Sequence, residues 1–283
     1  MLPQNIINLY DEYTHEPLSR MEFIQRLAQI VGGTAAAMSI LPLLESNYKA
    51  PIVSDDENLL TEKISYAGVN GEMKAYIARP KEDKAYPTII VIHENRGLTP
   101  HIEDVARRVA NAGFLAVAPN ALAPIGEVAD EDEARKKFSE LKAEDNQQNF
   151  IRAFAYTATR KDCNGNFGCV GFCWGGAMSN YLAANVSNLK AAVAFYGRQI
   201  NTEDVPKIKA ALQLHYAEND ERVNAGMESY EEALKTNGIK YESYLYPGVQ
   251  HAFHNDTSVA RYNEEAAKLA WGRTIDFFNK YVR

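Results

Sequence analysis

A series of short, continuously apolar runs, separated by amphipathic stretches, most constrains what this chain can fold into. Continuous runs are typical of strands buried on both faces of a sheet, because a half-exposed strand alternates apolar and polar residues. The runs cover residues 88–92, 114–118, 167–170, 191–195 and 211–215, and a more alternating one covers 241–246. Strands that alternate with helices predict an α/β fold with a mainly parallel sheet and helices on both faces.

The stretches between these runs carry helix signals. Thr99-Pro100 is an N-cap residue followed by proline at the first helical position, and this helix is expected to stop near Gly113. A heavily charged helical stretch at about 130–159 could be broken. Further helices are expected at about 174–184, 225–236 and 259–281.

Two alternating runs precede the first buried strand. Residues 61–66 and 73–78 are joined through Asn70-Gly71. Asn-Gly between two such runs is a strong β-hairpin signal. We therefore expect a hairpin that adds antiparallel strands at one edge of the sheet.

The first 50 residues differ from the rest and predict a helical extension (residues 1–50) on a catalytic domain (residues 51–283). Ser19-Arg20-Met21-Glu22-Phe23-Ile24 precedes an apolar run, as in a twin-arginine export signal, but Met21 stands where that motif has arginine. The alternative is a retained amphipathic helix, which we favour. One helical face would then carry Phe23, Leu27, Ile30 and Val31.

A retained helix could dock on the body of the protein or on a second copy, as in a homo-oligomer. We expect no stable membrane span, because Gly32, Gly33 and Pro42 interrupt the apolar run. The expected location is cytoplasmic, or periplasmic if the segment acts as an export signal. In either case we expect the extension to contribute little to the chemistry.

Charge and cysteine content exclude several classes of protein. The chain has 30 basic and 37 acidic side chains among 283 residues, a net charge of −7 without a basic stripe, so nucleic-acid binding is not expected. The cysteines are Cys163, Cys169 and Cys173, and an odd number does not form a disulfide framework. No nearby His or Cys completes a zinc site with Cys169 and Cys173, so no metal is expected.

The strongest local motif is Gly171-Phe172-Cys173-Trp174-Gly175-Gly176, between an apolar strand and a helical stretch. It has the G-x-nucleophile-x-G form of a nucleophile elbow, whose sharp turn leaves little room for a Cβ at the flanking positions. The thiol of Cys173 would sit at a helix N-terminus, where the helix dipole favours thiolate. The alternative is that Cys173 is a small buried core residue.

Partners for this nucleophile follow later strands in the order acid, then base, that the elbow motif requires. Asp220 lies on a polar loop after the 211–215 strand, with Glu218 as a rival. His251 lies in the loop after the 241–246 strand, with His254 as a rival. Asp220 would orient the imidazole, His251 would take the thiol proton, and the thiolate would attack a carbonyl.

Backbone N–H groups are the expected donors to the developing oxyanion. In an elbow of this kind one donor is the N–H of the residue after the nucleophile, here Trp174. The other comes from a loop after an earlier strand, and we assign it to the N–H of Asn95 in the loop His93-Glu94-Asn95-Arg96-Gly97.

Together, GFCWGG, IHENRGL, the pair Asp220 and His251, and PGVQHAF resemble the dienelactone hydrolase (carboxymethylenebutenolidase) family, over about residues 60–283. The resemblance implies a single α/β-hydrolase domain, no cofactor, and hydrolysis of a lactone or related small ester through an acyl-cysteine. It also implies that Glu94 contacts the resting cysteine and helps to generate the thiolate when substrate arrives.

The expected substrate grip departs from the family pattern. The arginines that bind the dienelactone carboxylate in the family are absent after His251 and after the 114–118 strand. Arg198, which follows Tyr196-Gly197, could substitute, so Tyr196 and Arg198 are the candidate substrate-binding residues. Two alternatives stay open: a broad carboxylesterase or thioesterase with the same triad, and a non-catalytic scaffold that assembles through its N-terminal segment.

Overall fold

A computed structural model describes residues 2–45, 57–126, 128 and 130–283 of the chain. Its centre is an eight-stranded sheet in the order β1-β2-β4-β3-β5-β6-β7-β8. The strands are β1 (Leu59–Ala67), β2 (Glu72–Pro80), β3 (Tyr86–Ile92), β4 (Leu115–Asn120), β5 (Cys163–Phe172), β6 (Leu189–Phe195), β7 (Ala211–Asn219) and β8 (Tyr241–Gln250). The expected boundary between residues 50 and 51 lies outside the described residues.

The sheet is parallel from β4 to β8, and the predicted hairpin is confirmed at its other edge. β1 pairs antiparallel with β2, and β2 pairs antiparallel with β4. All other neighbouring strands run parallel, so their carboxyl ends meet at one edge. Loops that follow several different strands can therefore converge there.

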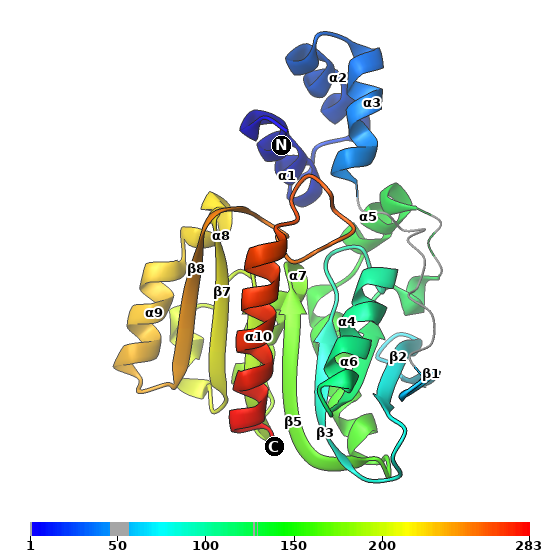
Figure 1. Ribbon diagram of the computed structural model, residues 1–283, viewed down its shortest axis with the longest axis vertical. Coiled ribbons are helices and arrows are strands. Elements are labelled where there is room, and N and C mark those ends of the chain that lie inside the picture. The colour runs from blue at the N-terminus through cyan, green and yellow to red at the C-terminus, as the bar shows by residue number, and fades with distance from the viewer. Residues whose placement is uncertain (1, 46–56, 127, 129) are drawn as a thin grey trace.

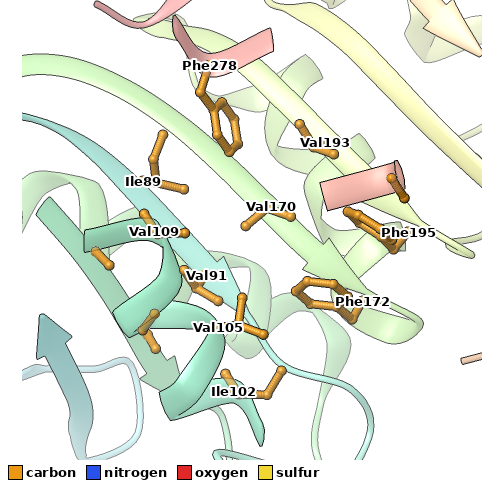
Figure 2. Packing of buried hydrophobic residues seen from close by; sticks show 14 of the residues in the cluster. Ile89, Val91, Ile102, Val105, Val109, Val170, Phe172, Val193, Phe195 and Phe278 are labelled. Carbon is orange, nitrogen blue, oxygen red and sulfur yellow. The ribbon is translucent and has the colours of Figure 1, made fainter. Parts of the chain in front are cut away.

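Alternate residues of the central strands serve two separate cores, one on each face of the sheet. Figure 2 shows one of them, where Val91 of β3 and Val170 of β5 face Val105 and Val109 of α4 (Pro100–Asn111). Helix α10 (Glu264–Tyr281) covers the same face and contributes Phe278. The opposite face packs against α6 (Ala143–Ala158), α7 (Trp174–Asn185) and α9 (Met227–Thr236). The α/β architecture predicted from the alternating pattern is confirmed.

Helix boundaries differ from the predicted ones where a polar side chain caps the chain. The charged stretch is broken into α5 (Glu131–Ser139) and α6, and short α8 (Glu221–Asn224) precedes α9. The prediction that the last helix starts near residue 259 is wrong. α10 starts at Glu264, because Asn263 caps it and its Oδ1 accepts a hydrogen bond from the Ala266 N–H at 3.0 Å.

The N-terminal residues form three helices, α1 (Gln4–His15), α2 (Arg20–Val31) and α3 (Thr34–Leu44), which lie beyond the carboxyl ends of the strands (Figure 1). The three helices share a small apolar core, the N-terminal cluster, and it includes Phe23 and Leu27, which are both fully buried. Ile30, which was expected on the same buried face, is 41% exposed.

None of the described helices is by itself long and apolar enough to cross a membrane, although α2 and α3 satisfy that test as a pair that bends by 110°. The bend lies at Gly32 and Gly33, both of which have positive φ. The association of copies through this segment stays a prediction.

Helix α1, which lies within the predicted helical extension of residues 1–50, attaches the N-terminal cluster to the body. The Tyr10 hydroxyl donates to the Glu131 carboxylate at 2.5 Å, and the Tyr13 hydroxyl donates to Asp132 at 2.7 Å, both at the start of α5. The Arg135 guanidinium lies 4.1 Å from the centre of the Tyr13 ring. Buried Tyr10 and Tyr13 therefore fix α1 against the catalytic domain.

Leu27→Ala should loosen the N-terminal cluster, since it leaves a cavity among fully buried side chains at a cost of about 2–5 kcal/mol. Ile30→Ala, three residues away on the same helix, should change the free energy of unfolding by less than about 0.5 kcal/mol because Ile30 is exposed. Amide hydrogen exchange across α1–α3 measures both. Equal loss of protection in the two variants would contradict the packing described here.

Candidate active site

Cys173 lies in the tight turn between β5 and α7, with φ 55° and ψ −112°. These angles are strained for a residue with a Cβ, at a cost on the order of 1–3 kcal/mol. The turn is so tight that a Cβ on Gly171 would lie 1.8 Å from the Gly175 carbonyl oxygen. A Cβ on Gly175 would lie 2.3 Å from the carbonyl oxygen of Ile92 in β3. The flanking glycines are thus required by close backbone contacts.

Asp220 and His251 meet beyond the ends of β7 and β8. The His251 Nδ1 lies 2.5 Å from the Asp220 Oδ2, and both side chains are buried. The rival residues lie elsewhere: Glu218 accepts a hydrogen bond from the Gly248 N–H at an exposed position, and the His254 ring stacks on Phe172 at 5.0 Å. The His251 Nε2 is buried without a hydrogen-bond partner, and one ring nitrogen of His251 lies within 4.8 Å of the Cys173 Sγ.

Electrostatics in this group favour a thiolate and two imidazolium rings. Burial opposes the ionisation of Cys173, but the nearby His15 and His251 outweigh it and lower the pKa of the thiol to about 5. Burial likewise opposes protonation of His251, but Asp220 and then Cys173 raise its pKa well above the ordinary value. The pKa of Asp220 is lowered, since His251 overcomes the effect of its burial.

The nearest polar contact of the thiol comes from the N-terminal extension. The His15 Nε2, at the end of α1, lies 3.2 Å from the Cys173 Sγ. The His15 ring also meets the His251 ring edge-on, with ring centres 4.8 Å apart. The extension thus contacts the predicted nucleophile, which the sequence pattern did not indicate. No motif marks His15, and 158 positions separate it from Cys173.

Glu94 and Cys173 line a small pocket together, but the Glu94 carboxylate is directed to other partners. Its Oε2 accepts from the Asn255 Nδ2 at 2.8 Å, and its Oε1 accepts from the Tyr196 hydroxyl at 3.3 Å. The expected contact between Glu94 and the resting thiol is not among the hydrogen bonds of the described residues. The His15 imidazole makes that contact instead.

A cavity of about 710 Å³ opens onto Cys173 and gives a substrate room to bind. Both residues expected to supply oxyanion donors, Asn95 and Trp174, line it, and so do the candidate substrate-binding residues Tyr196 and Arg198. Four arginines in all contribute to its wall, namely Arg96, Arg135, Arg198 and Arg222. Apolar surface comes from Leu18, Phe138 and Trp174, among others.

One ligand atom from each of His15, Cys173 and His251 lies within 4.8 Å of the others. A metal ion binds only deprotonated imidazoles, and the raised pKa values of His15 and His251 oppose that form, so this group does not suit a metal ion.

Cys173 should react with iodoacetamide before Cys163 and Cys169 at neutral pH. Its lowered pKa means that the thiolate is present above about pH 5 and is lost as the pH falls through that value. Burial raises the pKa of Cys169 to about 12, which keeps it a thiol across this range. Mass spectrometry of peptides labelled between pH 4 and 9 measures the three rates. Equal, slow labelling of all three cysteines would contradict the electrostatics described above.

Comparison with known proteins gives one consistent family. The dienelactone hydrolase family model matches residues 73–282. A Methylorubrum extorquens protein named "Putative carboxymethylenebutenolidase" is 31% identical over 264 residues, which cover 88% of this chain and 89% of that protein. An Escherichia coli (strain K12) protein of the same name is 30% identical over 265 residues, with coverage of 88% and 95%.

A solved structure from Klebsiella pneumoniae, named "Putative Dienelactone Hydrolase", superposes with a TM-score of 0.72 at 28% identity, and covers 79% of this chain and 99% of that one. Fold, family model and relatives agree on an α/β-hydrolase that acts on esters or lactones. The chain belongs to the dienelactone hydrolase family.

Proposed function

We propose that this protein hydrolyses a lactone or small ester with Cys173 as nucleophile, through an acyl-cysteine intermediate. The observation that carries the proposal is the position of the Cys173 thiol. It sits on a strained elbow within 4.8 Å of a ring nitrogen of His251, and the Nδ1 of this ring is held by Asp220. A nucleophile, a base and a group that orients the base are the three parts that acyl transfer requires.

Acylation starts when the Cys173 thiolate attacks the carbonyl carbon of the substrate. The carbonyl oxygen becomes an oxyanion, and the N–H groups of Asn95 and Trp174 are its proposed donors. The tetrahedral intermediate then collapses, the bond between carbon and the ester oxygen breaks, and the His251 Nε2 donates its proton to that oxygen. In a lactone the alcohol product stays attached to the acyl group.

Deacylation uses the His251 imidazole in the opposite direction. Its neutral Nε2 removes a proton from water, and the resulting hydroxide attacks the thioester carbon. The bond between carbon and sulfur breaks, which releases the acid and regenerates the Cys173 thiolate. His251 ends the cycle protonated beside Asp220, as it began.

Cys173→Ala should abolish turnover of both ester and lactone substrates, since no other thiol lines the cavity among the described residues. Cys173→Ser should keep the fold and lose most of the activity, because a hydroxyl is a weaker nucleophile at a site tuned for thiolate. Steady-state kinetics, together with mass spectrometry of acid-quenched protein, would measure turnover and an acyl group on Cys173. An active Cys173→Ala variant would overturn the nucleophile and favour a non-catalytic role for this thiol.

For the substrate, we propose a lactone or ester that carries a carboxylate. Arg198, which follows β6, and Arg222, at the start of α8, both line the cavity that opens onto Cys173. Guanidinium groups at the mouth of a cavity favour anionic ligands. The alternative is a broad carboxylesterase or thioesterase, for which the apolar wall of Phe138 and Trp174 would suffice.

Arg198→Gln should raise the KM for a carboxylated lactone by about 10- to 150-fold, because it removes a charge-assisted hydrogen bond of about 1.5–3 kcal/mol. Turnover of p-nitrophenyl acetate, which has no carboxylate, should not change and serves as the internal control. Comparing the two substrates on the unmodified enzyme tests the class itself. If neutral short esters are turned over far faster than the carboxylated lactone, the protein is the broad esterase instead.

A further inference from the structure

We propose that His15 is a second catalytic histidine, whose Nε2 holds the proton of Cys173 in the resting enzyme. His251 is then reserved for the leaving group and for water. The proposal rests on the proposed role of Cys173 as nucleophile. It gives the N-terminal extension a part in the reaction itself.

Distances favour His15 over His251 as the resting partner of the thiol. The His15 Nε2 is 3.2 Å from the Cys173 Sγ, within hydrogen-bonding range for sulfur, and the His15 side chain is only 11% exposed. The His251 Nε2 makes no hydrogen bond of standard geometry within the described residues, although His251 is close enough to help lower the pKa of the thiol. A buried imidazole nitrogen without a partner is available to a substrate atom or a water.

The hydrogen bonds of His15 fix which of its nitrogens is basic. Its Nδ1 lies 2.9 Å from the backbone carbonyl oxygen of Asp11. A carbonyl oxygen can only accept, so the Nδ1 carries a hydrogen. In the neutral ring the Nε2 is then a bare lone pair that faces the Sγ. The proton of the thiol therefore moves to the His15 Nε2, and the products are a thiolate and an imidazolium.

Asp11 places a carboxylate beside His15, at a longer distance than Asp220 does beside His251. The Asp11 Oδ1 lies 3.3 Å from the His15 Nδ1, and its Oδ2 lies 3.7 Å from the Nε of Arg222. Burial works against protonation of His15, and the repulsion from His251 does so weakly, but Cys173 and Asp11 outweigh them and raise its pKa. The charged groups around His15 thus favour the imidazolium form beside a thiolate.

Helix α1 is held firmly enough to make this contact a fixed part of the site. The Thr14 carbonyl oxygen, one residue before His15, accepts from the Asn95 Nδ2 at 2.9 Å. Asn95 belongs to the loop proposed to bind the oxyanion, so His15 and the oxyanion donors are positioned by the same contact. The buried bond from Tyr10 to Glu131 anchors the preceding turn of the helix.

The family resemblance implies that Glu94 contacts the resting cysteine and helps to generate the thiolate. In this protein His15 takes that role. Glu94 is held by Asn255 and Tyr196, and the basic atom in contact with the Sγ is the Nε2 of His15. Throughout the cycle His15 keeps the proton that it took from the thiol, opposite Asp11. His251 alone gives and takes the protons of the leaving oxygen and of water.

Two substitutions separate proton transfer from packing. His15→Gln keeps an amide group of similar reach that can donate to the sulfur but cannot take its proton, and His15→Ala removes the contact. Glu12→Gln is the matched control on α1, because Glu12 is exposed and pairs with Arg26 of α2. Circular dichroism and thermal unfolding establish that each variant is folded before it is assayed.

The first readout is the pH dependence of iodoacetamide alkylation of Cys173. In the wild type and in Glu12→Gln its midpoint should lie near the lowered pKa of about 5, and in both His15 variants it should rise toward the ordinary thiol value of 9.0. The second readout is rapid-quench kinetics with p-nitrophenyl acetate. Acylation at pH 7 should slow by on the order of 10²-fold in the His15 variants, whereas deacylation, which depends on His251, should stay within about threefold.

Other outcomes would contradict either the role of His15 or the proposed function. An unchanged alkylation profile in His15→Gln and His15→Ala would remove His15 from the reaction. Faster alkylation and turnover in those variants would show that α1 is an inhibitory cover, which also overturns the proposal. If Cys173→Ala keeps its activity, the proposed function fails first. If Cys173→Ala is inactive and only the His15 variants behave as wild type, the further inference alone fails.

Discussion

The close approach of three backbone segments at the elbow is the constraint on which the rest of the site depends. Gly171 and Gly175 face each other across the turn at distances that exclude a side chain, and Gly175 also abuts the end of β3. This crowding holds Cys173 at positive φ and directs its thiol away from the sheet. Because the adjoining strands are parallel, the loops that carry Asp220 and His251 reach the same edge. The catalytic group is thus a product of the sheet topology as much as of its own residues.

A second constraint is that the buried charges around Cys173 must balance one another. The ionised thiol is accompanied by the carboxylates of Asp11 and Asp220, and these three negative groups face two imidazolium rings and the guanidinium of Arg222. Ions in the interior are costly unless they are paired, so the members of such a set stabilise one another. Removal of one member leaves an uncompensated charge. The thiol pKa is consequently a property of the group, and α1 contributes two of its six members.

Local patterns explain why most of the fold and the triad residues could be predicted from sequence. Some features depend on residues that are close along the chain, and short motifs predict them. They are the elbow glycines, the Asn70-Gly71 turn and the apolar runs. Asp220 was preferred to Glu218 for its place on the loop after a strand, and His251 to His254 because its loop resembles the family's; the structure brings the chosen pair together. The last helix was predicted to start about five residues too early, because helical periodicity does not reveal that Asn263 caps it.

The contact between His15 and Cys173 could not be predicted in this way, because it depends on how an extension folds back over the sheet. The residues that dock α1 are tyrosines, and their partners are acids on α5; neither set forms a recognisable motif. The apolar run after Arg20 instead indicated an export signal or an assembly helix. A terminal segment that shares no motif with a catalytic domain can nevertheless complete its active site, provided that buried polar contacts fix its position. In this chain Tyr10 and Thr14 meet that condition, so the proposed catalytic unit includes α1 as well as the region from β1 to α10.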